Sequence, residues 1–97
     1  MDKIKKFNKK TYRQLERIMK GTSSHRRIQI MVLLKKEPEL SVVEIAIELD
    51  INMKTASHHI NQLARSGLVL KRNDSSSVRH KLTKNGESIL MFLRTLE

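Results

Sequence analysis

Hydrogen-bonding side chains recur at helical spacing within residues 53–66. Ala56, Ile60 and Leu63 fall on one face of this segment, so the predicted helix buries that face and turns a polar one outward. The outward face carries Lys54, Ser57, His58, Asn61 and Arg65. Ammonium, hydroxyl, imidazole and amide groups match the donors and acceptors that base pairs display in the major groove of DNA. The first four of these residues are therefore our candidates for base-edge contacts.

A short helix is predicted directly before this polar helix. Residues 41–44 have the S-x-x-E spacing of a capping box, which opens a helix through Leu49. Residues 50–52 form a polar break, and Asn52 is a good N-cap for the next helix. Two helices joined by such a turn form a helix-turn-helix, whose second helix enters the major groove. We predict this motif over residues 41–66; the alternative is an ordinary helical hairpin whose polar face meets water.

The periodicity changes after Gly67 from that of a helix to that of a strand. Residues 68–72 and 78–82 flank the turn-forming segment 73–77, which predicts a β-hairpin over residues 68–82. The hairpin and the adjoining Lys84 carry five basic residues against a single acid, Asp74. Such a hairpin is suited to lie along a phosphate backbone, so we predict a wing that contacts DNA beside the groove.

Net charge favours a polyanionic partner. The 97 residues carry 20 Lys and Arg against 10 Asp and Glu, a formal net charge of +10. Arg26 and Arg27 would oppose the dipole of a helix that begins near Ser24, so we assign them to phosphate contact, with simple solvent exposure as the alternative. The basic residues before them either form a DNA-contacting arm or, as we favour, the solvated side of a helix: Lys5, Lys6, Lys9, Lys10 and Arg13.

The predicted DNA-binding residues come from the polar helix, the N-cap of the short helix before it, the first turn of the helix that begins near Ser24, and the wing. They are Lys54, Thr55, Ser57, His58, Asn61, Arg65, Ser41, Arg26, Arg27, Lys71, Arg72, Arg79 and Lys81.

Apolar stripes run along the first and last predicted helices. The first covers residues 3–20 and ends at Gly21, and the last opens at Thr83 and is more apolar than a short terminal helix needs. The helix between Ser24 and Pro38, with Ile28 and Val32 in its stripe, should be the most buried. Another surface should therefore cover the last helix.

Several classes of protein are disfavoured by what the sequence lacks. The absence of cysteine excludes disulfides, thiolate metal sites and cysteine nucleophiles. His58 and His59 are helical neighbours that point about 100° apart and cannot share one metal ion. No catalytic motif, nucleotide-binding loop, signal peptide or membrane-spanning segment occurs. We expect a cytoplasmic protein that is not an enzyme and needs no metal or other cofactor.

The histidines have other expected roles, and His25 and His80 are isolated in the sequence. We expect His59 to be a partly buried packing or hydrogen-bonding residue, and His25 and His80 to be solvated or to face phosphate.

The fold class that accommodates these elements is mainly α, as an α+β winged helix. A chain of 97 residues is enough for one compact domain, so we predict a single winged helix-turn-helix domain over residues 1–97. It comprises an N-terminal helix over 1–21, the helix-turn-helix over 41–66, the two-stranded wing over 68–82 and a C-terminal helix over 83–97.

The stretch Thr55–Val69 contains S-x-H-I-x-x-L-x-x-S-G-L-V and, with residues 39–46 before it, resembles the winged helix of the ArsR/SmtB repressors. By order of elements the resemblance extends over residues 24–97. It implies a two-fold dimer built from the first and last helices, with two recognition helices on a partly palindromic site. The segments 1–21 and 83–97 would then be dimerisation helices, and the expected dimer seam is Ile4, Phe7, Leu15, Ile89, Phe92 and Leu96.

The resemblance does not extend to metal sensing. Metal-sensing members place thiolates in an E-L-C-V-C-type motif where this chain has Ser41 and Val43. Its last helix has no histidine and only Glu87 before the terminal Glu97.

The expected function is a sequence-specific double-stranded DNA-binding regulator, a dimeric repressor that does not respond to metal through cysteines, with its effector left open. The alternative is a winged-helix module that docks an acidic protein. RNA binding is disfavoured, because Phe7, Tyr12 and Phe92 lie in helical stripes and offer no stacking platform.

Overall fold

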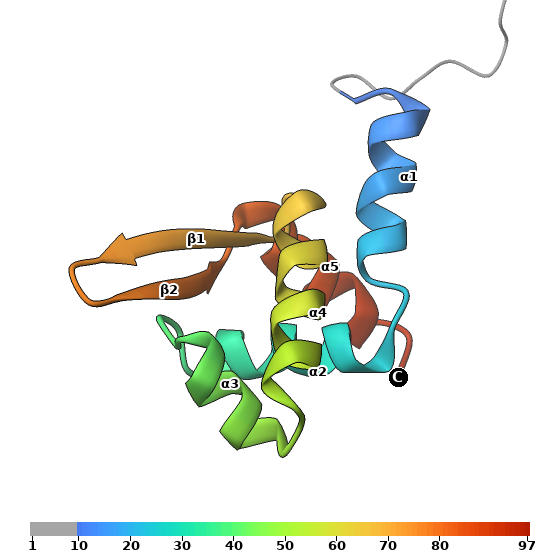
Figure 1. Cartoon of the computed structure of the whole chain (residues 1–97). Helices are drawn as coiled ribbons and strands as arrows, with labels where there is room; N and C mark the ends of the chain where they lie inside the picture. Colours follow the sequence, from blue (N-terminus) through green and yellow to red (C-terminus); the bar gives the residue numbers. More distant parts are fainter. Residues whose placement is uncertain (1–9) are drawn as a thin grey trace, which may run out of the picture.

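The computed structural model describes residues 10–97, which form five helices and a two-stranded antiparallel sheet and confirm the predicted winged-helix class (Figure 1). Figure 1 shows the hairpin projecting from one side of the helical body and the first helix standing on the other. In chain order the elements are α1 Tyr12–Gly21, α2 His25–Lys36, α3 Val42–Leu49, α4 Met53–Arg65, β1 Val69–Asp74, β2 Ser77–Leu82 and α5 Lys84–Arg94.

Helix α2 lies at the centre of the core, as expected for the most buried helix. It packs against α3, α4, α5 and β2, and its Ile30, Met31 and Leu34 are almost completely buried. The predicted inner stripe is wrong in part, because Val32 is 41% exposed and Ile28 is half-buried. A helix that is apolar on most sides does not reveal its buried face by periodicity alone.

The first residues of the helices are set by side-chain caps. Ser41 and Glu44 form the predicted capping box of α3, with the Glu44 amide donating to Ser41 Oγ at 3.2 Å and the Ser41 amide donating to Glu44 Oε1 at 2.8 Å. Thr11 and Gln14 form a second capping box, which starts α1 at Tyr12. The prediction of one helix over residues 3–20 is therefore wrong at Lys10 and Thr11. Its segment 3–9, including Ile4 and Phe7 of the dimer seam, lies outside the described residues.

The wing has a shorter turn than predicted. Strand β1 pairs with β2 in the register Val69↔Leu82 through Asp74↔Ser77, so only Ser75 and Ser76 lie between the strands. The predicted five-residue turn over 73–77 is wrong because Asn73 and Asp74 continue the ladder. Both strands emerge from the core at Val69 and Leu82, which are buried.

Helix α5 packs closely against the segment between α4 and β1. The Thr83 hydroxyl donates to the Gly67 carbonyl at 2.6 Å and accepts from the Gly86 amide at 3.0 Å. A Cβ at Gly86 would lie 2.2 Å from the Leu68 carbonyl oxygen, so this approach requires glycine. The contact fixes the start of α5 beside the base of the wing.

None of the helices in residues 10–97 combines the length and the apolar character needed to cross a membrane.

Candidate nucleic-acid interface

The outer face of α4 is arranged as its periodicity predicts. Ala56, Ile60 and Leu63 are buried on its inner face. Asn52 caps the helix, because its Oδ1 accepts from the Lys54 amide at 2.7 Å and from the Thr55 amide at 3.4 Å. The structure leaves the predicted contact residues on the outer face exposed or half-buried: Lys54, Thr55, Ser57, His58, Asn61 and Arg65.

The wing lies directly beside this face. Lys71 on β1 donates from Nζ to Oδ1 of Asn61 on α4, which joins the two elements by a side-chain hydrogen bond. Lys81 on β2 is exposed and has no side-chain partner among the described residues. The structure thus brings Lys71 and α4 together as one cationic, hydrogen-bonding surface, whereas Lys81, paired with Leu70 in the ladder, lies on the opposite face of the wing.

The two wing arginines are bound by acids that precede or flank the wing. Arg72 donates to Glu39 Oε1 from Nε at 3.0 Å and from an Nη at 2.7 Å, and this carboxylate raises the pKa of Arg72 further above its ordinary value. Arg79 donates to the Glu39 carbonyl at 3.1 Å and forms ion pairs with Asp74 at 3.2 Å and Glu44 at 3.7 Å. Both arginines connect the wing to the segment before α3.

Two of these acids have pKa values that their hydrogen bonds lower. The hydrogen bond from Arg79, with that from the Ser75 amide, holds the pKa of Asp74 below its ordinary value. The hydrogen bonds from Ser41 lower the pKa of Glu44 in the same direction. The sequence alone does not show these pairings, because Glu39 and Glu44 lie more than thirty residues before their arginine partners.

His80 corrects the expectation of a solvated or phosphate-facing residue. It is only 3% exposed, and its Nδ1–H donates to the Leu40 carbonyl at 2.9 Å. Its amide also donates to that carbonyl at 2.9 Å, and its own carbonyl accepts from the Glu39 amide at 2.8 Å. Burial lowers the pKa of His80, which favours the neutral imidazole. The residue joins β2 to the segment before α3 as a short β-bridge.

Arg26 and Arg27 differ in their surroundings. Arg27 donates from Nε to the Gly21 carbonyl at 2.6 Å and from an Nη to the Lys20 carbonyl at 3.3 Å, so it binds the C-terminal end of α1. Arg26 makes one side-chain hydrogen bond, to Gln29 at 3.1 Å. Arg26 therefore remains the better placed of the two for an external anion.

His59 is partly buried, as expected. Its Nδ1 accepts from an Nη of Arg27 at 3.4 Å, and burial followed by the charge of Arg27 lowers the pKa of His59. His58 is exposed, with its ring centroid 5.5 Å from that of His59. Residues 10–97 contain no cluster of three or more His, Asp or Glu side chains that could hold a metal ion.

The described part of the predicted dimer seam divides into two groups. Ile89 packs against the core and Leu15 is half-buried, whereas Phe92 is 47% and Leu96 66% exposed. Sequence reasoning missed Met91, which is 70% exposed beside Phe92. The signal for it was available, since residues 89–93 are uninterrupted apolar sequence.

Known proteins share this arrangement of elements. Residues 24–71, about half of the chain, match the family model "Bacterial regulatory protein, arsR family". The transcriptional activator HlyU of Vibrio cholerae is 33% identical over 66 residues, which cover 68% of this chain and 60% of HlyU. The cadmium resistance transcriptional regulatory protein CadC of Listeria innocua is 38% identical over 56 residues, which cover 58% of this chain and 47% of CadC. The matches thus span about half to three fifths of these relatives' length.

A solved structure extends the likeness beyond the matched segment. The homodimeric winged helix-turn-helix DNA-binding domain of Mb0332 from Mycobacterium bovis superposes with a TM-score of 0.80 at 26% identity, over 88% of this chain and 79% of that one. The relatives named here are regulators of transcription and not enzymes. With its capped α3, its polar α4 and its wing, the chain belongs to the ArsR-like family of winged helix-turn-helix regulatory proteins.

Proposed function

We propose that the protein is a sequence-specific regulator of transcription that binds double-stranded DNA as a homodimer. The observation that carries this proposal is the outer face of α4, where exposed and half-buried polar and cationic side chains lie beside Lys71 of the wing. Family membership supports the same function.

In the proposed complex, α4 lies in the major groove. Its N-terminal half presents Lys54, Ser57 and His58 to base edges, and Asn61 retains its amide donors while its oxygen accepts from Lys71. Lys71 and Lys81 lie on the wing, where they would meet phosphates. Arg72 and Arg79 either exchange their carboxylate partners for phosphate on binding or hold the wing at the correct angle.

The proposed dimer uses the exposed apolar side chains of α1 and α5. Met91, Phe92 and Leu96 project from α5, and Met19 is half-exposed on α1. The family's Mb0332 domain is homodimeric, which supports this assembly. Two α4 helices would then read half-sites about one helical turn, ~34 Å, apart.

We propose repression as the direction of control, because a dimer that occupies a promoter blocks it without needing a further contact. The relatives include both an activator and a putative repressor of an arsenical resistance operon, so only a promoter assay decides the direction. The sequence contains no cysteine, so release from DNA would not proceed through metal binding by thiolates.

The test is fluorescence anisotropy with random and promoter-derived duplexes across a salt series, with light scattering on the same samples. We expect a dimer whose affinity falls steeply as salt rises, because bound phosphates release counterions. Replacing His58 by Ala should change the preference among duplexes. Failure to bind any duplex at low salt would contradict the proposal and favour an acidic protein as the partner.

A further inference from the structure

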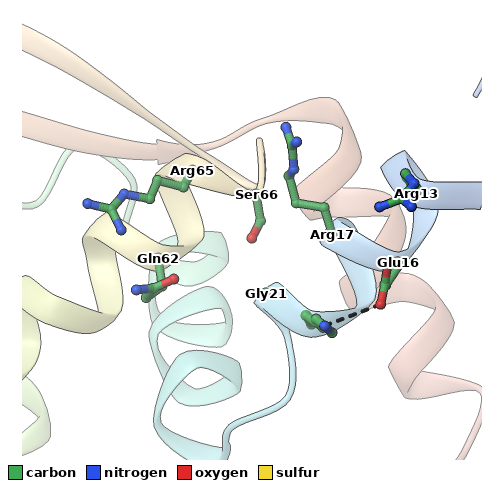
Figure 2. Close-up of a pocket in the computed structure, with 8 residues that line it drawn as sticks. Arg13, Glu16, Arg17, Gly21, Gln62, Arg65 and Ser66 are labelled. Carbon is green, nitrogen blue, oxygen red and sulfur yellow. Dashed lines mark ion pairs between the residues drawn. The ribbon is translucent and has the colours of Figure 1, made fainter. Parts of the chain in front are cut away.

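A cleft of about 650 Å³ lies between α1 and the C-terminal end of α4 (Figure 2). Its α1 wall contains Arg13, Arg17 and Lys20, and Arg65 comes from α4. The acid in this lining is Glu16, which forms an ion pair with Lys20 at 3.2 Å. No residue of the cleft is among the proposed base contacts, and only Arg65, on the outer face of α4, belongs to the predicted DNA-binding set.

The arginines of this cleft differ from those of the wing because nothing in the described chain neutralises them. Arg13, Arg17 and Arg65 have no hydrogen bond or ion pair with any residue in the range 10–97, whereas Arg72 and Arg79 are bound by carboxylates. Three guanidinium groups around one cleft repel one another unless an anion lies between them. Their planar donor sets suit phosphate and carboxylate oxygens.

The walls of the cleft are held in place by close packing. A Cβ at Gly21 would lie 2.2 Å from Ser66 Oγ, so the end of α1 lies directly against the end of α4. Arg27 fixes the same end of α1 through the Gly21 and Lys20 carbonyls. Gln62 and Ser66 add polar groups to the α4 wall. The cleft is therefore a defined space and not only a charged helix face.

We propose that this cleft binds a small polyanion carrying two or more phosphate or carboxylate groups, and that this ligand weakens DNA binding. The inference rests on the proposed function for its regulatory part. The volume falls within the range of about 300–1,000 Å³ that small ligands occupy. The charged lining selects a highly anionic ligand.

Arg65 supplies the link to DNA. It stands seven residues after His58 and four after Asn61, which places it on the same outer face of α4. Figure 2 shows its stem beside the cleft and its guanidinium turned away from α1. With no bond to hold it, this side chain can turn toward an anion in the cleft. The ligand would then remove a cation from the DNA-binding face and place negative charge beside it.

The experiment is calorimetric titration of the full chain with tripolyphosphate at constant ionic strength, followed by duplex anisotropy with and without that anion. We expect one ion per chain, a loss of about tenfold or more in its affinity for Arg17→Ala, and no change for Lys36→Ala, which removes an exposed cation outside the cleft. Tripolyphosphate should weaken duplex binding severalfold in the wild type and clearly less in Arg65→Ala, which has no Arg65 cation to withdraw from the DNA-binding face.

Two outcomes would overturn the inference. One is the absence of saturable 1:1 binding, or equal effects of Arg17→Ala and Lys36→Ala. The other is that Arg17→Ala weakens duplex binding while tripolyphosphate does not change duplex binding by the wild type. The cleft would then bind only the phosphates of the DNA backbone. Duplex binding without anion binding leaves the proposed function intact, and anion binding without duplex binding contradicts the proposed function alone.

Discussion

The basic side chains of this protein differ in whether the chain itself supplies their partners. Arg27, Arg72 and Arg79 donate to carbonyls or carboxylates of the chain itself. Lys54 and Lys81 are exposed and uncommitted within the described residues. Exposed ion pairs contribute little free energy of folding, so the value of the first group is geometric: it orients the wing and α1. In the proposed complex with DNA, phosphate contact would fall mainly to the second group.

Substitutions at Lys81 and Arg79 should separate these roles. Lys81→Ala should weaken all duplexes similarly and reduce the slope of log affinity against log salt by about 1, because one phosphate contact is lost. Arg79→Ala should also weaken all duplexes, and in addition it should speed hydrogen exchange of the hairpin amides, because the wing loses its bonds to Glu39 and Asp74. Unchanged exchange in Arg79→Ala would refute the orienting role, and unchanged affinity in both variants would remove the wing from the interface.

His80 makes the free energy of unfolding depend on pH. Burial lowers the pKa of His80 in the folded protein, so the unfolded chain takes up the proton more readily. The stabilisation that neutral His80 provides should be fully present above about pH 6.5, the ordinary pKa of histidine. The free energy of unfolding should fall as the pH drops from there through the lowered pKa of the folded protein. His59 contributes in the same direction because its pKa is also lowered.

Urea unfolding between pH 5 and 8 measures this effect. His80→Asn keeps an N–H donor for the Leu40 carbonyl but does not titrate, so its stability should vary less with pH than that of the wild type. An identical pH profile in the two proteins would show that the His80 pKa is not perturbed.

Among the elements, those specified by local sequence were predicted and those specified by distant contacts were not. The Ser41–Glu44 capping box and the Asn52 cap depend on neighbours within three residues, and both were read correctly. The Thr11–Gln14 box had the same kind of signal and was overlooked.

Other features depend on residues far away in the chain. The burial of His80 requires Leu40, forty residues earlier, and the length of the wing turn follows from the pairing of Asp74 with Ser77. No local pattern reports either feature. The exposed face of α4 was predicted well because a 3.6-residue period identifies it directly.

Gly86 offers a test of the packing between α5 and the base of the wing. Gly86→Ala should lower the free energy of unfolding by about 1–3 kcal/mol, because the added methyl meets the backbone carbonyl of Leu68, which cannot turn away as a flexible side chain could. Ser88→Ala, at an exposed position of the same helix, is the matched control and should leave stability nearly unchanged. Equal unfolding midpoints for the two variants would contradict the close approach.

At the level of the assembled protein, affinity for DNA should depend on pairing two chains. A dimer places two α4 helices on one duplex, so the second half-site binds without a further loss of translational freedom. Neither α4 nor the wing contributes to the proposed seam, so recognition and assembly occupy different faces of the molecule.

Phe92→Lys and Leu96→Lys should convert the dimer to a monomer and reduce affinity for a two-half-site duplex by more than tenfold. Lysine is the informative substitution, because its positive charge by itself should strengthen attraction to DNA. A loss of affinity in these variants would therefore report the loss of the dimer. Both residues are exposed, so the monomer should remain folded. Val32→Lys, at an exposed apolar position on α2, is the control. Light scattering and anisotropy would disprove the seam if the α5 variants stayed dimeric.

The buried residues of the hydrophobic core all come from α2 onward, and within the described chain α1 adds only the partly buried Ile18. If the chain dimerises through α1 and α5 as proposed, folding and assembly should therefore be separable events. A chain that loses its α1 contacts should keep its hydrophobic core and α4. Dilution, or cleavage near Thr22, should therefore give a folded monomer that can bind one half-site. Calorimetry at falling protein concentration should accordingly resolve dissociation as a transition of its own, preceding the melting of the core.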